Sequence, residues 1–273
     1  MKYNLYIMKT STWTQLAFCL LSSVFYACNS SHVYYLDATS GSDQNNGTSP
    51  RSAWQSIEAL KQISLQPGDK ILLKKGETFP GILEVTGKGT YTHPIIIDAY
   101  GEGNQKPCIA GNDTSMYAVR IFNSDYFTIQ NLEISNTGEK RKAGRTGLKV
   151  ECTDYGISHN IRINNLTIRD VNGSLVKEEG GGSGILIVNG GDSIRSCFDS
   201  LTIENCHILR CERNAMIWSG YYDRENWYPN KHTIVRNNVI EKVPGDGIVP
   251  IGCDSTLIEY NLMCDSPDIL PMT

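Results

Sequence analysis

The sequence predicts an all-β solenoid, a single-stranded right-handed parallel β-helix with a short N-terminal capping helix. Three observations predict this fold: a segment that recurs five times, period-2 alternation of Ile, Val and Thr within each copy, and an asparagine at the same place in four copies. Strands that stack on copies of themselves are parallel, and each copy buries its apolar face only against its neighbours.

The five repeats begin at Tyr117, Gly147, Gly184, Asn214 and Gly247, so their starts lie 30, 37, 30 and 33 residues apart. Each opens with a short apolar strand, turns through polar residues and closes with a second alternating strand. Ile, Val and Thr punctuated by Gly and Asn favour strands over helical repeats of similar length. The uneven spacing predicts loops of different size inserted at fixed corners.

The recurring asparagines are Asn131, Asn165, Asn205 and Asn237, and Tyr260 takes their place in the last repeat. Asparagine tolerates the left-handed backbone conformation and hydrogen-bonds to neighbouring backbone. We therefore expect the same sharp bend in each coil, with stacked side-chain amides.

Residues 1–28 have the pattern of an export signal, because Lys2 and Lys9 precede the apolar run "LAFCLLSSVFYAC", which is too short to span a bilayer. Ala27 and Cys28 resemble a bacterial lipoprotein cleavage site, with Cys28 as the acylated residue. The expected location is therefore the periplasm, or the outer membrane or cell surface as a lipoprotein. Plain secretion is the alternative.

Residues 32–112 are expected to form the N-terminal cap and the first coils. The segment "SAWQSIEALKQI" predicts an amphipathic helix, and "GDKILLKKGETF" and "PIIIDAY" predict strands. The apolar positions of that helix are Trp54, Ile57, Leu60 and Ile63. Residues 113–273 form the remaining coils, and because the chain stops directly after the fifth repeat, we expect the N-terminal part of a longer protein, truncated at its C-terminal end.

A formal charge of -4 gives no reason to expect nucleic acid as a partner, and a membrane is expected only through a lipid anchor. We expect a monomer. After Cys28 the chain has seven cysteines and no CxxC pair, which argues against a zinc site or a full disulfide framework.

The stretches "YYLDATSGSDQNNGTSPRSAWQSIEAL", "LQPGDKILLKKGETF", "LTIRDVNG" and "GDGIVPIGCDSTLIEYN" resemble the secreted right-handed β-helix proteins of the pectin-lyase-like superfamily, especially those of polysaccharide-degrading gut bacteria. The resemblance implies the fold and a polysaccharide or oligosaccharide ligand. That superfamily includes lyases, glycoside hydrolases, esterases and phage tail proteins, so the fold does not select the reaction.

Alternation in the opening strands predicts which side chains leave the coil. The inward set is Leu148, Val150, Ile185, Ile187, Ala215 and Ile217, and the outward set is Lys149, Glu151, Leu186, Val188, Met216 and Trp218. Long loops flank this outward face and would form a groove for a polymer. The expected substrate-binding residues are Trp218, Tyr221, Tyr222, Arg213 and Lys149, since aromatic faces pack against sugar rings. Alternatively, the aromatic loop after Trp218 packs onto its own scaffold.

Hydrolysis of a glycosidic bond needs two carboxyl groups, and the expected catalytic residues are Asp246, Glu212 and Asp254. Glu212 and Asp246 precede the opening strands of consecutive repeats, so stacking would bring them close. The remaining candidates are Glu151, Glu178 and Glu179. Asp246 and Asp254 have an alternative as turn residues, and Arg213 either clamps the substrate or pairs with Glu212.

The leading hypothesis is an exported polysaccharide-degrading glycoside hydrolase. A lyase is the first alternative, with Lys149 or Arg145 as base, and only that reaction would call for calcium. Otherwise no cofactor or metal is expected, because His159, His207 and His232 lie in separate repeats and the acidic residues form no dense cluster. The second alternative is a carbohydrate-binding β-helix or an inactive fragment.

Overall fold

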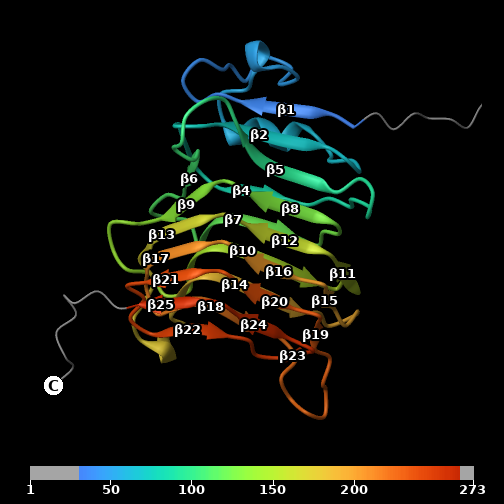
Figure 1. Cartoon of the computed structure of the whole chain (residues 1–273), viewed down its shortest axis with the longest axis vertical. Coiled ribbons are helices and arrows are strands. Elements are labelled where there is room, and N and C mark those ends of the chain that lie inside the picture. The colour runs from blue at the N-terminus through green and yellow to red at the C-terminus, as the bar shows by residue number, and fades with distance from the viewer. Residues whose placement is uncertain (1–30, 265–273) are drawn as a thin grey trace, which may run out of the picture. The chain divides into compact units, whose positions relative to one another are not determined.

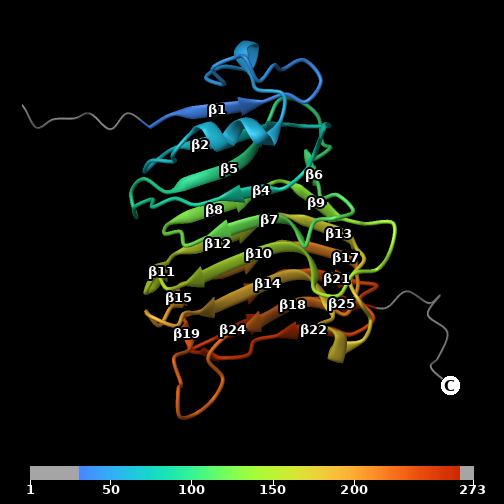
Figure 2. The same ribbon diagram turned by 180° about the vertical axis from the view of Figure 1, so that it is seen from behind.

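The computed structural model describes residues 31–264, so the predicted signal segment and Cys28 lie outside the described residues. Within them the chain winds into coils whose strands stack in four sheets (Figures 1 and 2). Each coil runs through sheets I, II and III in turn, and from the third coil also through sheet IV, before returning to sheet I. Neighbouring strands pair in parallel, which confirms the predicted parallel β-helix.

The strands are as follows. Sheet I contains β1 (Val33–Leu36), β2 (Lys70–Lys74), β5 (Ile95–Tyr100), β8 (Phe127–Gln130), β12 (Ile161–Asn164), β16 (Thr202–Glu204), β20 (Ile234–Arg236) and β24 (Leu257–Glu259). Sheet II contains β3 (Thr78–Pro80), β6 (Cys108–Ala110), β9 (Glu133–Asn136), β13 (Thr167–Val171), β17 (His207–Cys211), β21 (Val239–Glu241) and β25 (Leu262–Cys264). Sheet III contains β4 (Leu83–Val85), β7 (Tyr117–Phe122), β10 (Arg145–Thr153), β14 (Gly182–Gly190), β18 (Asn214–Ser219) and β22 (Asp246–Val249). Sheet IV contains β11 (Ile157–His159), β15 (Cys197–Asp199), β19 (Asn230–Lys231) and β23 (Cys253–Asp254).

Aliphatic side chains stack in columns along the inside of the coils. In sheet I, Ile97, Ile129, Ile163, Ile203 and Val235 are direct register partners from coil to coil, and all five are fully buried. Burying one such side chain contributes roughly 1.5–3 kcal/mol. The core is therefore continuous along the stack.

The predicted bends are present. Asn131, Asn165, Asn205, Asn237 and Tyr260 all have a left-handed backbone, with φ between 51° and 60°. The predicted amide stacking is only partial, because Asn165 Nδ2 donates to Asn131 Oδ1 at 2.7 Å whereas the Asn205 amide donates to Asn164 instead of Asn165. Asparagine therefore recurs at these bends mainly because it tolerates the left-handed backbone conformation.

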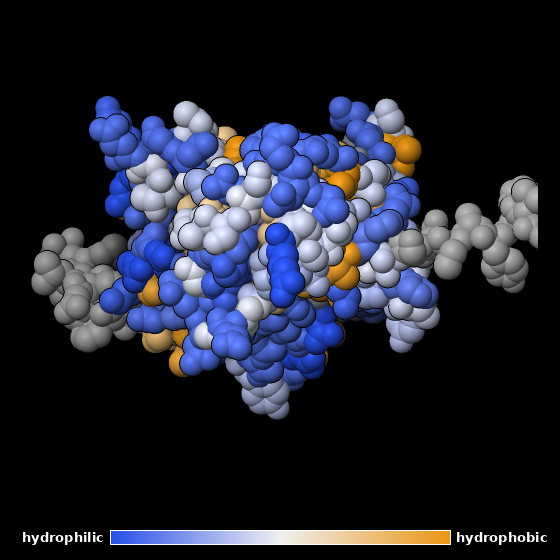
Figure 3. All heavy atoms as spheres, turned by 90° about the horizontal axis from the view of Figure 1, so that it is seen from above, coloured by the Kyte–Doolittle hydropathy of each residue, from blue (hydrophilic) through white to orange (hydrophobic). Residues whose placement is uncertain are grey.

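The N-terminal cap differs from the expected amphipathic helix. The helical part is a 3₁₀ helix, η2 (Ile57–Gln62), and Trp54 lies before it in a bridge with Leu36 and stacks on Tyr34 with ring centroids 5.3 Å apart. The other 3₁₀ turns are η1 (Pro50–Ser52) and η3 (Lys177–Glu179). Seen from above, this end of the molecule has a mostly hydrophilic surface (Figure 3).

The prediction of which side chains point into the coil and which point out is wrong in one strand, β18, by a single residue. Leu148 and Val150 of β10 are buried, as expected, but in β18 the buried side chains include Met216 and Trp218, and Ile217 faces outward. Asn214 pairs with Ser183 and not with Gly184, with which the repeats had aligned it. A shift of one residue in a strand exchanges its two faces.

Candidate active site

The outer face of sheet III carries a column of side chains in direct register. From β4 to β22 the column is Glu84, Arg120, Lys149, Leu186, Ile217 and Val249. The half formed by β4, β7 and β10 is charged, and the half formed by β14, β18 and β22 is apolar. The face therefore offers two different surfaces to a ligand.

The charged half is neutralised internally. Arg120 pairs with Glu84 at 3.1 Å and with Glu151 at 2.8 Å, and Lys149 also pairs with Glu151 at 2.8 Å. Burial acts to raise the pKa of Glu84, but hydrogen bonds from Tyr117 and Arg120 outweigh it and lower that pKa. Lys149 does lie on the predicted outer face, as a member of this network.

A hollow opens beside the apolar half. It is lined by the apolar side chains of Ile217, Val249 and Ile251 and by Lys177, Gly180, Gly181, Arg213, Asn214 and Asp246. Apolar surface with a few convergent polar groups is the usual composition of a ligand site. Lys177 and Asn214 were not expected from the sequence; Asn214 could have been found only by aligning it with Ser183.

Asp246 and Arg213 form the polar centre of this hollow. Arg213 Nη2 lies 3.1 Å from Asp246 Oδ2, and the Asp246 side chain is 53% exposed. Arg213 has φ of 74°, a left-handed conformation that is uncommon for a residue with a side chain and that recurs at functional sites. The structure thus brings these two predicted site residues together.

Glu212 does not stack on Asp246, contrary to the expected alignment. The register partner of Asp246 is Asn214, two residues further along the chain. The carboxylate of Glu212 pairs with Arg141, and its side chain is 21% exposed. Glu212 nevertheless directly precedes Arg213, which lines the hollow.

Asp254 lies on a different sheet from Asp246. It ends β23 of sheet IV, where its register partner in β19 is Lys231, and its carboxylate accepts a hydrogen bond from the amide of Ser255 at 2.8 Å. That geometry is typical of a turn residue. The three predicted catalytic carboxylates therefore do not form one cluster.

Trp218 cannot contact a substrate, because its side chain is fully buried. The prediction that it lines the groove is wrong, for the register reason given above. Tyr221 is half-buried, and its hydroxyl donates to the carbonyl of Gly191 at 3.0 Å. Tyr222 is 71% exposed.

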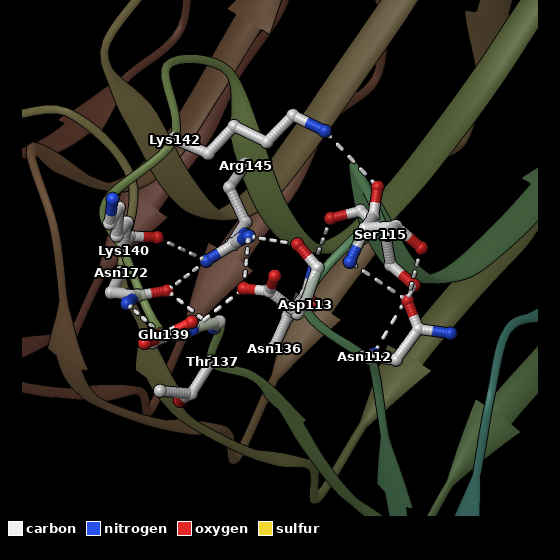
Figure 4. Close-up of polar contacts among 12 residues, drawn as sticks. Asn112, Asp113, Ser115, Asn136, Thr137, Glu139, Lys140, Lys142, Arg145 and Asn172 are labelled. Carbon is white, nitrogen blue, oxygen red and sulfur yellow. Dashed lines mark hydrogen bonds and ion pairs between the residues drawn. The ribbon is translucent and has the colours of Figure 1, made fainter.

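Arg145, considered as a lyase base, is also buried, with only 1% of its side chain exposed. Its guanidinium donates to the carbonyls of Lys140 and Asp113 and to the side chain of Asn172 (Figure 4). These contacts fasten the 137–144 loop to the coil. The same loop carries Arg141, the partner of Glu212.

Among residues 31–264 no group of three or more His, Cys, Asp or Glu side chains is arranged to hold an ion. His159 pairs with Asp125, His207 with Glu241 and His232 with Asp199. In the same range no helix is both long and apolar enough to cross a bilayer.

Comparison with solved structures identifies the fold. The native GH136 lacto-N-biosidase of Eubacterium ramulus superposes with a TM-score of 0.72 at 25% identity, over 91% of this chain and 46% of that one. The chain has a parallel β-helix fold like that enzyme's. A selenomethionine derivative of the same enzyme gives a TM-score of 0.67, over 86% of this chain and 44% of that one.

Curated relatives of this β-helix protein are glycosidases. A lacto-N-biosidase of Bifidobacterium longum subsp. longum is 26% identical over 314 residues, which cover 86% of this chain and 20% of that protein. An alpha-1,3-galactosidase A of Akkermansia muciniphila is 32% identical over 66 residues, 24% of this chain. No protein-family model matches. The chain spans about a fifth of the curated lacto-N-biosidase and less than half of the solved one.

Proposed function

We propose that this β-helix belongs to a glycoside hydrolase that acts on an oligosaccharide. The observation that carries the proposal is the similarity to lacto-N-biosidases over 86–91% of the chain, in sequence and in structure. Fold alone would not select hydrolysis, but similarity of this extent to glycosidases favours it over the other chemistries hosted by β-helices.

The outer face of sheet III supports a neutral substrate in preference to a polyuronate. The basic side chains considered as lyase bases are already engaged: Lys149, like its neighbour Arg120, pairs with glutamate, and Arg145 lies in the interior. An elimination reaction would need one of them as a free base. The apolar half of the face, by contrast, suits the C–H faces of sugar rings.

We assign the reacting carboxylate to Asp246, at the rim of the hollow. A base or nucleophile must be exposed to its substrate and fixed in orientation, and Asp246 is both, because Arg213 holds one carboxylate oxygen at 3.1 Å. Glu212 is the second carboxylate of the proposal, with Arg141 as its orienting partner. Two such groups are what glycoside hydrolysis requires.

Residues 1–28 support export and lipid attachment at Cys28, so the proposed enzyme works as a lipoprotein in the periplasm or at the cell surface. Metabolic labelling with a tagged fatty acid should mark the parent chain and leave a Cys28→Ala variant unmarked. Labelling of both proteins alike would refute acylation at Cys28.

The activity test is the release of reducing ends from a panel of neutral oligosaccharides, with absorbance near 235 nm followed in parallel to detect elimination. We expect reducing ends without absorbance, and loss of about 100-fold or more in rate for Asp246→Asn. The matched control is Glu58→Gln, which removes an exposed carboxylate of η2 and should retain the parent rate. Equal rates in Asp246→Asn and the parent would refute the assignment.

Two further variants locate the second carboxylate. Glu212→Gln should lower the rate if the pair is the one proposed here. A loss that follows Asp254→Asn and spares Glu212→Gln would instead place the second group at the turn after β23.

A further inference from the structure

The loop between β18 and β19, residues 220–229, carries four aromatic side chains that differ in their exposure. Tyr221 and Tyr228 pack edge to face with ring centroids 5.9 Å apart, and both are half-buried. Tyr222 and Trp227 are 71% and 45% exposed. The exposed rings of Tyr222 and Trp227 are therefore available to a ligand, and covering them would remove apolar surface from water.

The base of this aromatic loop is fixed to the coil. Buried Asn189 accepts a hydrogen bond from Asn230 Nδ2 at 2.9 Å and donates to the carbonyl of Ser196 at 3.0 Å. Gly220 passes so close to Asn189 that a Cβ atom there would lie 2.0 Å from Asn189 Oδ1. One end of the loop is thus hydrogen-bonded to Asn189, and the other end packs directly against the same side chain.

The tip of the loop is ordered by its own hydrogen bonds. Asp223 accepts from the amide of Glu225 and from the side chain of Asn226, each at 3.1 Å, and Arg195 reaches across to Asn226 Oδ1 at 3.2 Å. The loop projects from the stack beside β19 and β23 (Figures 1 and 2). A rigid aromatic surface binds with little loss of conformational entropy.

A second hollow separates this loop from the 191–195 turn. It is lined by Tyr221, Tyr222, Asp192, Ser193, Arg195 and Asn226, among other residues. Aromatic rings together with hydroxyl, amide and oppositely charged groups fit a ligand that is hydroxylated and carries no net charge. The composition favours a neutral sugar over an anionic or strongly basic ligand.

The two hollows lie at opposite ends of β18. Asn214 lines the hollow of Asp246, and the aromatic loop begins at Gly220, six residues further along the strand. At about 3.3 Å per residue the two ends are roughly 20 Å apart. Between them the outward side chains Leu186, Val188 and Ile217 form an apolar surface.

We propose that Tyr222 and Trp227 form a binding platform for a neutral sugar unit of an oligosaccharide that extends along the outer face of β18. The platform holds a unit distant from Asp246, so it selects for substrates longer than a disaccharide. The extension toward Asp246 rests on the proposed function, whereas sugar binding by the platform stands independently of catalysis.

Tryptophan fluorescence tests the platform directly. Among the described residues Trp54 and Trp218 are buried, so iodide should quench Trp227 selectively in protein from which residues 1–27, with Trp13, have been removed. Neutral oligosaccharides of two, four and six units are titrated against the Asp246→Asn variant, which prevents turnover. We expect the longer two to protect Trp227 from iodide and to bind more tightly than the disaccharide.

Calorimetric titration of variants then locates the contact. Tyr222→Ala and Trp227→Ala should each weaken binding of the longer oligosaccharides by about 2- to 10-fold. Tyr222→Phe keeps the ring and should retain the affinity. Tyr91→Ala, which removes an exposed tyrosine from the 87–94 segment, is the matched control. Melting temperatures verify that each variant folds.

Unchanged affinity in both alanine variants would overturn the platform, and equal affinity for all three lengths would overturn its extension toward Asp246. Failure of the two proposals is distinguishable. If Asp246→Asn abolishes hydrolysis while Tyr222→Ala and Trp227→Ala bind normally, only the platform is wrong. If no variant or parent hydrolyses any sugar while the alanine variants lose binding, only the hydrolase assignment is wrong.

Discussion

At the scale of single residues, the alternation within one strand decides what a substrate can meet. In β18 the large indole of Trp218 lies in the core and the smaller Ile217 faces the groove. Trp218 Nε1 is buried without a hydrogen-bond partner, so the ring is held there by packing alone. An unpaired buried donor costs free energy that the packing must exceed.

Replacement of Trp218 separates its structural role from a binding role. Trp218→Ala should lower the free energy of unfolding by about 3–5 kcal/mol, measured by urea denaturation, because it leaves a large cavity. Trp218→Phe should cost much less, since it also removes the unpaired N–H. A Trp218→Ala protein with parental stability and weakened sugar binding would contradict the buried assignment.

At the scale of elements, one buried arginine connects two loops to the coil beneath them. Arg145 donates to Lys140 and Asp113, which belong to different loops, and also to Asn172 (Figure 4). Because Arg141 lies in one of these loops, the position of the cation beside Glu212 depends on Arg145.

Removal of the Arg145 guanidinium should loosen these loops selectively. In Arg145→Met each acceptor that loses its hydrogen bond from the guanidinium costs about 1–3 kcal/mol of local stability. Amide hydrogen exchange should therefore accelerate in residues 112–116 and 137–144. Exchange in β20 and β24 should not change. Arg51→Met, at an exposed arginine of η1, is the control. Uniform acceleration along the whole chain would instead indicate global destabilisation.

At the scale of the whole molecule, carboxylates and thiols of the stacked coils make stability depend on pH at both extremes. Hydrogen bonds from His232 lower the pKa of Asp199, and those from Arg210 lower the pKa of Asp170. Burial acts to raise the pKa of Glu204, but hydrogen bonds from Arg236 and Arg162 outweigh it and lower that pKa. Burial raises the pKa of Cys206 and Cys211 to about 12.

These shifts predict a plateau of stability from about pH 5 to pH 8. Carboxylates with a lowered pKa contribute stability above their unfolded values near 4, and lose it as the pH falls through the folded values. Thiols with a raised pKa contribute fully below about 8.5 and lose that contribution as the pH rises toward 12. Urea denaturation at a series of pH values checks the predicted loss of stability at acidic and at alkaline pH. Glu204→Gln should make the loss of unfolding free energy at acidic pH shallower. An unchanged loss in that variant would contradict the role of Glu204.

The amino-acid sequence by itself determined the repeat, the strand faces of β10 and β14, and the left-handed bends from Asn131 to Tyr260. These features are local, since period-2 alternation and the preference of asparagine for positive φ act within a few residues. Tertiary structure alone decided the register of β18, the burial of Trp218 and Arg145, the pairing of Arg213 with Asp246, and the placement of Asp254 on another sheet. Register between coils depends on contacts between residues about 30 positions apart, across loops of unequal length, and a shift of one residue there exchanges core and surface.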